Sequence, residues 1–485
     1  MKLQDPTLFR QAAFLAGEWI PPAEGNSQVI LNPASGAVVG VVPNISAEQL
    51  ESVIVESQKA FSTWRQHTGK ERASILRQWA DLMIANTEDL ARIMTAEQGK
   101  PLAEARGEIA YAASFLEWFG EEAKRGYGHT IPEPKRGQRI VVTKEPIGVC
   151  AAITPWNFPA AMVTRKVAPA IAAGCTVILK PAPQTPFSAM ALCVLAERAG
   201  LPKGVLSVVT GDAQMIGAVF SESTVIRKIS FTGSTAVGKV LMRQAAATVK
   251  KLSLELGGNA PFIVFNDADI DAAVVGAMAS KFRNAGQTCV CVNRFYVQQG
   301  VHDKFVAKLR EATAKFKVGP GDQEGVSIGP LVNAQAAAKV KELVEDAVRK
   351  GAKIVTASPL SEITGNFYPP TVLTGVMPTM RIAQEEIFGP VAAVTSFESE
   401  DEAIRLANGT RYGLAAYVYT HDLNRSHRLA RALECGILGV NEGVVSTEVA
   451  PFGGIKESGF GKEGSFYGLD EYLDSKYVCY GGVDQ

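Results

Sequence analysis

Histidine and cysteine are scarce in this sequence, and neither is arranged in a metal-binding or disulfide pattern. None of the five histidines lies at a ligand spacing from a pair of cysteines, so we expect no zinc site. The seven cysteines are odd in number and widely scattered, which excludes a disulfide scaffold. No apolar run is long enough to span a membrane, and residues 1–22 lack the ordered regions of a signal peptide. We therefore expect a cytoplasmic protein.

The chain also lacks an excess of either charge, because 49 lysines and arginines balance 49 aspartates and glutamates. A neutral balance argues against nucleic acid or an anionic membrane surface as the main partner, but it leaves room for a small basic pocket. At 485 residues the chain fits two or three domains. We expect a small molecule as its partner.

Strands and helices alternate along most of the sequence. A strand–helix pattern repeats over residues 147–256, with helices ended by glycines such as Gly174. This alternation predicts the α/β class, with an open and mostly parallel sheet and right-handed crossovers. A second α/β unit starts near residue 261. Two strand-like runs, 137–144 and 476–480, stand apart from both units and favour pairing with another chain, so we expect an oligomer.

Several predicted strands end in loops that suit a phosphate-bearing ligand, and ligands of such sheets bind at the carboxyl ends of strands. The loop Phe-Thr-Gly-Ser-Thr-Ala-Val-Gly at 231–238 joins a strand to a helix. It resembles a phosphate-binding turn, because a helix N-terminus offers free N–H groups to an anion. Lys180 ends another strand and has the reach to hydrogen-bond a ribose or a phosphate. Together the two loops favour a dinucleotide.

Three residues form the candidate catalytic set. Cys289 follows a glycine-containing turn, which can hold a thiol at the wall of a pocket. A free cysteine is only about 3% thiolate at pH 7, so a nucleophilic role requires a base or a positive field. Glu255, between apolar residues at the end of a predicted strand, is a candidate general base. Asn157, between two prolines and two aromatic residues, is a fixed amide of the kind that an oxyanion hole needs.

Six motifs resemble those of the aldehyde dehydrogenase superfamily. Each is weak alone, but six in the family's order and spanning nearly the whole chain are very specific. The motifs are Pro155-Trp-Asn-Phe-Pro159, Phe231-Thr-Gly-Ser234, Leu254-Glu-Leu-Gly-Gly258, Gly286-Gln-Thr-Cys289, Glu386-Ile-Phe-Gly-Pro390 and Pro451-Phe-Gly-Gly454.

The resemblance implies the fold of that family: a Rossmann-type cofactor domain, an α/β catalytic domain and a protruding β element for oligomerisation. We place the cofactor domain at residues 1–122 and 146–257 and the catalytic domain at 258–450. The oligomerisation or bridging element then comprises residues 123–145 and 451–485. A homodimer and a homotetramer are both consistent with this reading.

The resemblance also implies a mechanism. Cys289 is the nucleophile, Asn157 and the Cys289 backbone N–H form the oxyanion hole, and Glu255 is the base for deacylation. The thiolate attacks an aldehyde, the thiohemiacetal passes hydride to NAD(P)⁺, and water activated by Glu255 hydrolyses the thioester to a carboxylic acid. The residues implied to contact the cofactor, with Glu386 at the nicotinamide ribose, are Trp156, Lys180, Pro183, Gly211, Gly233, Ser234, Leu256, Glu386 and Phe388.

Two arginines point to the substrate. Arg165 and Arg283 stand where many members of the family have aromatic residues, and arginine there is a natural clamp for a carboxylate at the far end of the substrate. Each charge-assisted bond contributes about 1.5–3 kcal/mol, unless the arginine instead pairs with a protein carboxylate. With Ser446 as a third contact, the pattern indicates succinate semialdehyde. Glutarate semialdehyde stays open, because one methylene changes binding by only about 1–3 kcal/mol.

The choice between the two nicotinamide cofactors depends on Pro183. Strict NAD users in the family often carry glutamate at this position, which repels a 2′-phosphate. Proline does not repel it, and Lys180 can attract it, so we expect NADP with NAD also used.

Cys291 and two rival enzyme classes complete the predictions. Cys291 either fills space or, as the semialdehyde subfamily indicates, forms a reversible disulfide with Cys289 that stops activity under oxidation. An acylating relative that transfers the thioester to coenzyme A would not need Glu255 as a base. A thiol esterase would need no nicotinamide, and a non-catalytic binding protein would be expected to lack Cys289, Glu255 or Asn157.

Overall fold

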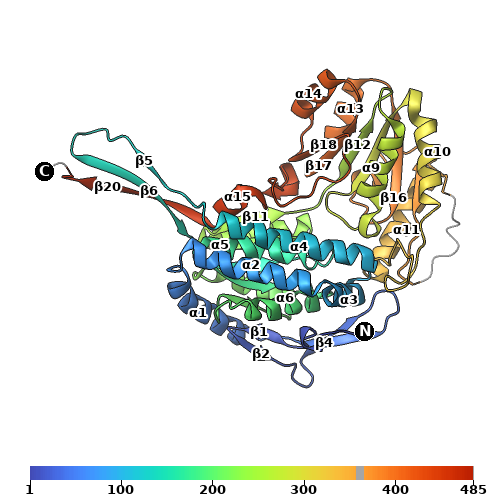
Figure 1. Ribbon diagram of the computed structural model, residues 1–485. Helices are drawn as coiled ribbons and strands as arrows, with labels where there is room; N and C mark the ends of the chain where they lie inside the picture. Colours follow the sequence, from blue (N-terminus) through green and yellow to red (C-terminus); the bar gives the residue numbers. More distant parts are fainter. Residues whose placement is uncertain (357–364, 484–485) are drawn as a thin grey trace.

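The computed structural model describes residues 1–356 and 365–483. Two α/β units lie side by side, and a β arm that carries the C-terminal strand projects from them (Figure 1). Each unit has its own open sheet, so the predicted fold class is confirmed. Within the described ranges, no helix combines the length and the apolarity needed to cross a membrane. Residues 357–364 of the predicted catalytic domain and 484–485 of the predicted bridging element lie outside the description.

The first sheet contains eight strands in the order β19-β11-β10-β7-β8-β9-β1-β2. The five strands from β11 to β9 are parallel, and the strands at both edges are antiparallel. Their bounds are β1 (Ala13–Leu15), β2 (Glu18–Ile20), β7 (Val149–Ile153), β8 (Thr176–Lys180), β9 (Leu206–Val208), β10 (Ile226–Thr232), β11 (Lys251–Glu255) and β19 (Gly459–Phe460). The chain runs outward from β7 through β8 and β9 and then returns to β10 on the other side of β7. The point where the strand order reverses therefore lies between β7 and β10, which is where open α/β sheets bind ligands.

Three of these strands were not predicted from the sequence. β1 and β2 have three residues each, and the turn between them consists of Ala16 and Gly17, both at positive φ (51° and 97°), as in a type I′ hairpin. β19 comes from the glycine-rich tail and pairs with β11, opposite Glu255. Part of segment 451–485 therefore belongs to the first sheet. The division into domains itself stays a prediction.

Helices cover both faces of the first sheet, and one of them, α5, is buried along its whole length. It packs against α4 and ends at Gly174, where φ is +97°. The helices of this unit are α1 (Ala47–Trp64), α2 (Gly69–Ala85), α3 (Thr87–Gln98), α4 (Leu102–Glu122), α5 (Ala161–Ala173), α6 (Pro186–Arg198), α7 (Ala213–Glu222) and α8 (Thr235–Ala245). Because α5 carries Arg165 and Lys166, its burial creates a need for buried counter-charges.

The second unit is built on seven strands in the order β14-β15-β16-β13-β12-β17-β18, all parallel except β14. The strands are β12 (Ala260–Val264), β13 (Val292–Gln298), β14 (Lys353–Ile354), β15 (Thr371–Thr374), β16 (Val391–Phe397), β17 (Ala415–Tyr419) and β18 (Ile437–Val440). The helices are α9 (Ile270–Phe282), α10 (His302–Thr313), α11 (Ala334–Arg349), α12 (Arg381–Gln384), α13 (Glu400–Asn408) and α14 (Leu423–Ala432). α15 (Ser465–Asp470) returns to the first unit and packs against α4 and α5.

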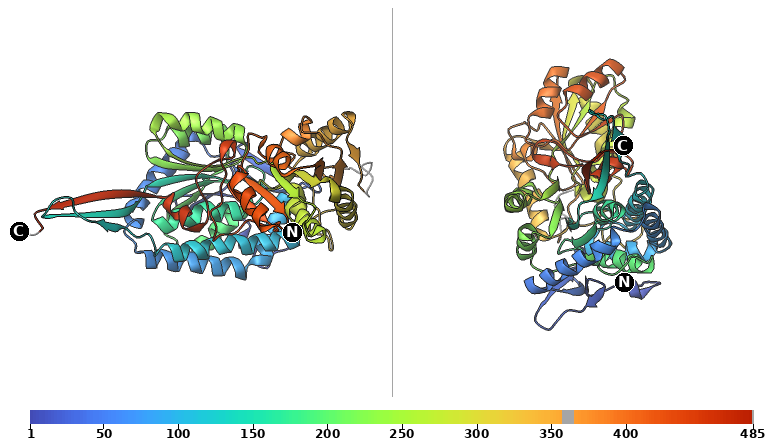
Figure 2. Two further views of the ribbon diagram at one scale, coloured as in Figure 1. Left: turned by 90° about the horizontal axis from the view of Figure 1, so that it is seen from above. Right: turned by 90° about the vertical axis from the view of Figure 1, so that its left-hand side faces the viewer.

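The arm consists of β5 (His129–Ile131), β6 (Gln138–Pro146) and β20 (Leu473–Gly481), and it extends clear of both units (Figure 2). The two strands that were predicted to stand apart are β6 and β20, and they pair antiparallel with one another over nine residues. A separate hairpin is formed by β3 (Ser27–Leu31) and β4 (Val38–Pro43).

Candidate active site

The loops that follow β7 and β10 meet at the reversal of the strand order and line a cavity of about 290 Å³. The first loop supplies Trp156 and Asn157, and the second supplies Gly233 and Ser234. Cys289 of the second unit lines the same cavity. The topology of the first sheet and one turn of the second unit thus bring together residues from three distant parts of the sequence.

A strained turn places Cys289 at this wall. The backbone is left-handed at Asn284 (φ 51°), Ala285 (φ 54°) and Gly286 (φ 75°), between α9 and the cysteine. A Cβ at residue 286 would lie 2.2 Å from the carbonyl oxygen of Gly389, so only glycine fits. The thiol of Cys289 is half-buried and reaches the cavity, as the glycine-containing turn predicted.

Asn157 is held through both its side chain and its backbone. Its Nδ2 donates to the carbonyl oxygen of Gln287 (2.9 Å), two residues before the cysteine. Its own backbone carbonyl accepts from Lys100 Nζ (2.8 Å) and from Asn284 Nδ2 (2.9 Å). One hydrogen of Nδ2 is therefore committed and the other is available to an oxygen in the cavity. The amide is thus held in place, and its role as an oxyanion donor stays a prediction.

Glu255 lies at the end of β11 and is buried, and it does not line the 290 Å³ cavity. In the described part of the chain, neither of its carboxylate oxygens has a hydrogen-bond partner. Burial raises the pKa of Glu255 well above its ordinary value, and the negative charge of Glu463 raises it further. Arg165 and Lys166 oppose this effect. A buried carboxyl without partners is typical of a group that exchanges protons, and the role of Glu255 as a base stays a prediction.

Glu463 is an important residue that the sequence analysis missed. It forms buried ion pairs with Arg165 (2.8 Å) and with Lys166, and it lies in the glycine-rich tail where no motif singles it out. The cations on either side lower the pKa of Glu463, so it stays charged. The signal that could have identified it is the need of the buried helix α5 for a counter-charge, which becomes visible only once the helix is seen to be buried.

Cys289 is a neutral thiol in this arrangement. Burial raises its pKa to about 12, and the nearby guanidinium of Arg165 acts in the opposite direction. At pH 7 the thiol must therefore lose its proton during the reaction. A nucleophilic role consequently depends on a base, as expected from the sequence.

Most of the predicted cofactor residues lie together. Trp156, Gly233, Ser234, Leu256, Glu386 and Phe388 all line the 290 Å³ cavity with Cys289. The rings of Trp156 and Phe388 meet edge-on, with centroids 5.5 Å apart. The carboxylate of Glu386 accepts from the backbone N–H of Gly258 (3.1 Å), and burial raises its pKa to about 7.

The N-terminus of α8 suits a phosphate group. Ser234 caps the helix by accepting from the backbone N–H of Val237, and no acidic residue lies in the first turn. A helix start with unused N–H groups and no negative charge attracts anions. Together with the aromatic rings and the Glu386 carboxylate, these groups fit a nicotinamide dinucleotide.

Three predicted cofactor residues do not line this cavity. Lys180 is buried, donates to the Pro181 carbonyl (3.1 Å) and keeps two donor hydrogens unused; burial lowers its pKa to about 8. The carbonyl oxygen of Pro183 accepts from the Gln28 side chain (2.7 Å). Gly211 packs on the backbone at Ile45, where a Cβ would lie 3.1 Å from the amide nitrogen. Their contacts with a cofactor stay predictions.

A second cavity, of about 310 Å³, adjoins the first at Phe158, which lines both. Arg283 and Ser446, predicted to bind the substrate, lie in its wall. Within the described residues, the Arg283 guanidinium forms no ion pair or hydrogen bond and lies 5.2 Å from the centroid of the Phe158 ring. The structure therefore places the Arg283 cation beside Phe158, the residue that separates it from the cavity that contains Cys289.

Arg165 is placed differently from Arg283. Its guanidinium is buried, pairs with Glu463 and stacks on Phe452 at 4.0 Å, and it lines neither cavity. The alternative weighed for each arginine, pairing with a protein carboxylate, is thus the arrangement observed for Arg165. A direct contact between Arg165 and a substrate stays a prediction.

Cys291 contacts Lys281 and does not line the cavity that contains Cys289. Its sulfur donates to the Lys281 carbonyl (3.3 Å) and accepts from Lys281 Nζ (3.5 Å). Both Cys289 and Cys291 are free thiols. The predicted disulfide would require Cys291 to leave Lys281.

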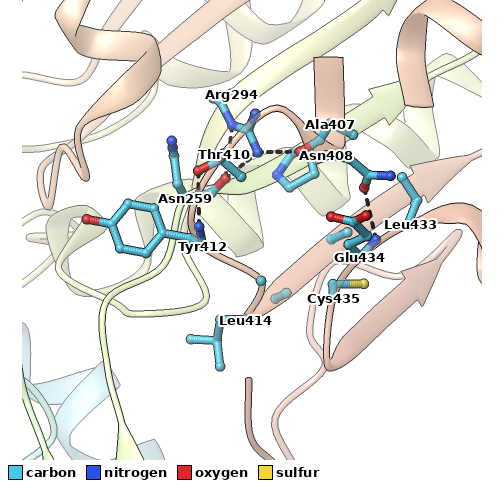
Figure 3. Close-up of a pocket in the computed structure, with 14 residues that line it drawn as sticks. Asn259, Arg294, Ala407, Asn408, Thr410, Tyr412, Leu414, Leu433, Glu434 and Cys435 are labelled. Carbon is cyan, nitrogen blue, oxygen red and sulfur yellow. Dashed lines mark hydrogen bonds between the residues drawn. The ribbon is translucent and has the colours of Figure 1, made fainter. Parts of the chain in front are cut away.

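A third cavity, beside Arg294 in the second unit, is unrelated to this site (Figure 3). Its volume is about 10 Å³, which is the space of roughly one water molecule. The guanidinium of Arg294 donates to the backbone oxygens of Asn259, Leu406 and Ala407 and to the hydroxyl of Tyr296. Arg294 therefore ties loops together and has no donor left for a ligand.

Comparisons with known proteins point to one family. The profile of the aldehyde dehydrogenase family matches residues 19–478. Glutarate-semialdehyde dehydrogenase of Pseudomonas aeruginosa is 56% identical over 483 residues, covering 100% of both chains. Succinate-semialdehyde dehydrogenase GabD of Escherichia coli (strain K12), whose name specifies NADP(+), is 56% identical and covers 99% of this chain and 100% of its own. The crystal structure of succinate-semialdehyde dehydrogenase from Burkholderia pseudomallei has a TM-score of 0.98 at 57% identity, covering 99% of this chain and 100% of that one.

Proposed function

Since the chain belongs to the aldehyde dehydrogenase family, we propose that it oxidises succinate semialdehyde to succinate with NADP⁺ or NAD⁺. The observation that carries this proposal is the pair of adjoining cavities. Cys289 and Asn157 line one of them with the residues suited to a dinucleotide. Arg283, which has no partner among the described residues, lines the other, with Phe158 between them. An aldehyde with a carboxylate at its far end can therefore present one end to sulfur and the other to guanidinium.

The first half of the reaction is the attack by Cys289. Its sulfur bonds to the aldehyde carbon, the thiol proton passes through water to the Glu255 carboxylate and from there to solvent, and the carbonyl oxygen becomes an oxyanion. Asn157 Nδ2 and the Cys289 backbone N–H donate to that oxygen, which stabilises the charge where it develops. When bound, the nicotinamide supplies the hydride acceptor that turns the thiohemiacetal into a thioester.

The second half depends on Glu255. Its carboxylate takes a proton from water, the water oxygen bonds to the thioester carbon, and the carbon–sulfur bond breaks to leave the acid and the Cys289 thiolate. The absence of hydrogen-bond partners at Glu255 within the described chain supports this role, since nothing there competes for its oxygens. Hydrolysis by a protein base also favours this reading over transfer to coenzyme A. The residues suited to a dinucleotide beside Cys289 favour it over a thiol esterase that needs no nicotinamide.

Glutarate semialdehyde is the second candidate substrate. The relative from Pseudomonas aeruginosa that carries this name is as similar to the chain as the Escherichia coli relative named for succinate semialdehyde. Both compounds carry the same two functional groups and differ by one methylene, so the same Arg283 can serve either.

The test is a comparison of kcat/KM on succinate semialdehyde, glutarate semialdehyde and butanal, each with NADP⁺ and with NAD⁺. We expect both semialdehydes to exceed butanal by about tenfold or more, which is the worth of one charge-assisted bond. Equal values for butanal and the semialdehydes would contradict the proposal. The NADP⁺ to NAD⁺ ratio measures the preference inferred from Pro183 and Lys180.

We also propose that the protein acts in the cytoplasm as a homodimer or homotetramer. All seven cysteines are free thiols, which suits a reducing compartment. β20 lies at one edge of the arm and exposes Tyr477 and Tyr480 (62% and 52% exposed), which suits pairing with a second copy. Sedimentation velocity of the intact chain and of a chain cut after residue 472 would test this role of the arm.

The Cys289–Cys291 disulfide remains our proposal for control by oxidation. Formation joins the two sulfurs with loss of two protons and two electrons to a peroxide, and dithiothreitol reverses it. We expect Cys291→Ala to lose more activity irreversibly in peroxide than the parent protein. Equal recovery of both proteins with dithiothreitol would remove the proposal.

A further inference from the structure

One face of α4 forms a wall of the 310 Å³ cavity. Glu104, Gly107, Glu108 and Tyr111 all line it and are spaced three and four residues apart, which places them in one row on a helix. A Cβ at Gly107 would meet nothing within 4 Å, so the missing side chain leaves open space along this row. The helix thus places two carboxylates and open space next to any ligand in the cavity.

Both carboxylates of this row already have partners: Glu104 accepts from the backbone N–H of Asn284 (2.8 Å), and Glu108 pairs with Lys100. Lys100 Nζ, which faces the row, pairs with Glu108, donates to the Asn157 carbonyl and lies 4.1 Å from the centroid of the Phe158 ring. Glu108 also accepts from the backbone N–H groups of Ala160 and Ala161 at the start of α5. The Lys100–Glu108 pair is therefore neutral overall, and two of the three N–H donors of Lys100 are committed to Glu108 and to the Asn157 carbonyl.

The hydroxyl of Tyr111 is different. It is buried, and no described residue hydrogen-bonds it. Its ring is held by edge-on contact with Phe115, at 5.0 Å between centroids, so the hydroxyl has a fixed position. Burial raises the pKa of Tyr111, so the phenol keeps its proton and acts as a donor. A buried polar atom without a partner calls for an explanation, because leaving it unpaired destabilises the protein.

We propose that Tyr111 is a specificity-determining residue whose hydroxyl donates to the carboxylate of the substrate, beside Arg283 and Ser446. The three residues line one cavity, and none of their side chains has a hydrogen-bond partner among the described residues. A carboxylate offers about four lone-pair sites, so it can accept from all three at once. Because Arg165 is held by Glu463, Tyr111 supplies the donor that the second arginine was expected to supply.

This inference rests on the proposed function and is tested by Tyr111→Phe, which removes only the hydroxyl. We expect kcat/KM on succinate semialdehyde to fall by about tenfold to a hundredfold, as expected for a hydrogen bond to a charged group. On butanal, which has the same number of carbons and no carboxylate, kcat/KM stays at the parent value. The matched control is Tyr127→Phe, since Tyr127 is 74% exposed and lies outside the cavity; it changes neither value.

The two failures are distinguishable. If the parent protein does not prefer semialdehydes to butanal, the proposed function fails before Tyr111 is tested. If the parent does prefer them and Tyr111→Phe loses nothing, or loses equally on both aldehydes, the role of Tyr111 is overturned while the function stands. A double-mutant cycle with Arg283→Ala adds a second readout, because two groups that hold one carboxylate show non-additive losses.

Discussion

The two cavities that meet at Phe158 are lined by different kinds of structure and side chain. The cavity that contains Cys289 is walled by turns at the ends of β7 and β10 and by aromatic rings, with Lys339 and Glu386 as its ionisable side chains apart from the thiol. The adjoining cavity is walled by one face of α4 and carries Lys100, Glu104, Glu108 and Arg283. Under the proposed function, sheet topology determines where the cofactor binds, whereas side chains on a helix determine which substrate fits. A change in one cavity should leave the function of the other intact.

The largest effect is expected at Cys289, because every substrate and either cofactor must reach its sulfur. Cys289→Ser should reduce NADPH formation by about 10⁴-fold or more with every aldehyde and either cofactor, because a serine hydroxyl is a far weaker nucleophile here. Cys291→Ser is the control and should keep most of the activity. A comparable rate in Cys289→Ser, measured from absorbance at 340 nm, would show that another nucleophile acts.

Asn157→Ala comes next. The loss of one oxyanion donor should reduce kcat by about 10² to 10³-fold. Because every aldehyde forms the same oxyanion, the factor should be equal for succinate semialdehyde and butanal. A loss confined to one of them would assign Asn157 to substrate binding instead.

Arg283→Ala should affect one cavity alone. We expect kcat/KM on succinate semialdehyde to fall by about tenfold to a hundredfold, while kcat/KM on butanal and KM for the cofactor hardly change. An equal loss of kcat/KM on both aldehydes would show that Arg283 does not bind the substrate carboxylate. The two cavities would then differ in structure but not in function.

The pH dependence of hydrolysis reports on Glu255. Its pKa is raised by burial and by Glu463, and the base must be ionised, so the rate should rise with pH and level off above that pKa. Glu463→Gln removes a negative neighbour, which lowers the pKa of Glu255 and should move the rising limb to lower pH. Single-turnover kinetics from pH 5 to 10 measure the limb, and its absence in Glu255→Gln is the control. An unmoved limb would mean that Glu463 does not influence Glu255.

The smallest effect is expected at the start of α8. Ser234→Ala removes a helix cap and should lower the free energy of unfolding by about 1 kcal/mol. It should also raise KM for the cofactor a few-fold and leave KM for the aldehyde unchanged. Ser46→Ala removes the cap of α1 in the same way and serves as the control, with a similar loss in urea unfolding and no change in either KM. Identical KM values for the cofactor in the two variants would show that the start of α8 does not contribute to cofactor binding.

Much of the site could be predicted from short segments. The turn before Cys289, the two prolines beside Asn157 and the strand end at Glu255 each have a local pattern, and the structure places Cys289 and Asn157 at one cavity. Arg165 and Arg283 show where local patterns stop being sufficient, because both are arginines in helical segments near motif residues. One pairs with Glu463 and the other has no partner in the described chain, and nothing in either segment distinguishes them.

The sequence by itself determined the alternation of strands and helices, the turns that only glycine allows and the chemical types of the reacting groups, because these depend on neighbours within a few residues. Only the tertiary structure decided that β6 pairs with β20, that Glu463 pairs with the buried cations of α5, and that the Tyr111 hydroxyl has no partner among the described residues. Such pairings depend on which distant segments the packing of two sheets and a buried helix brings into contact. Local preferences carry no information about that contact.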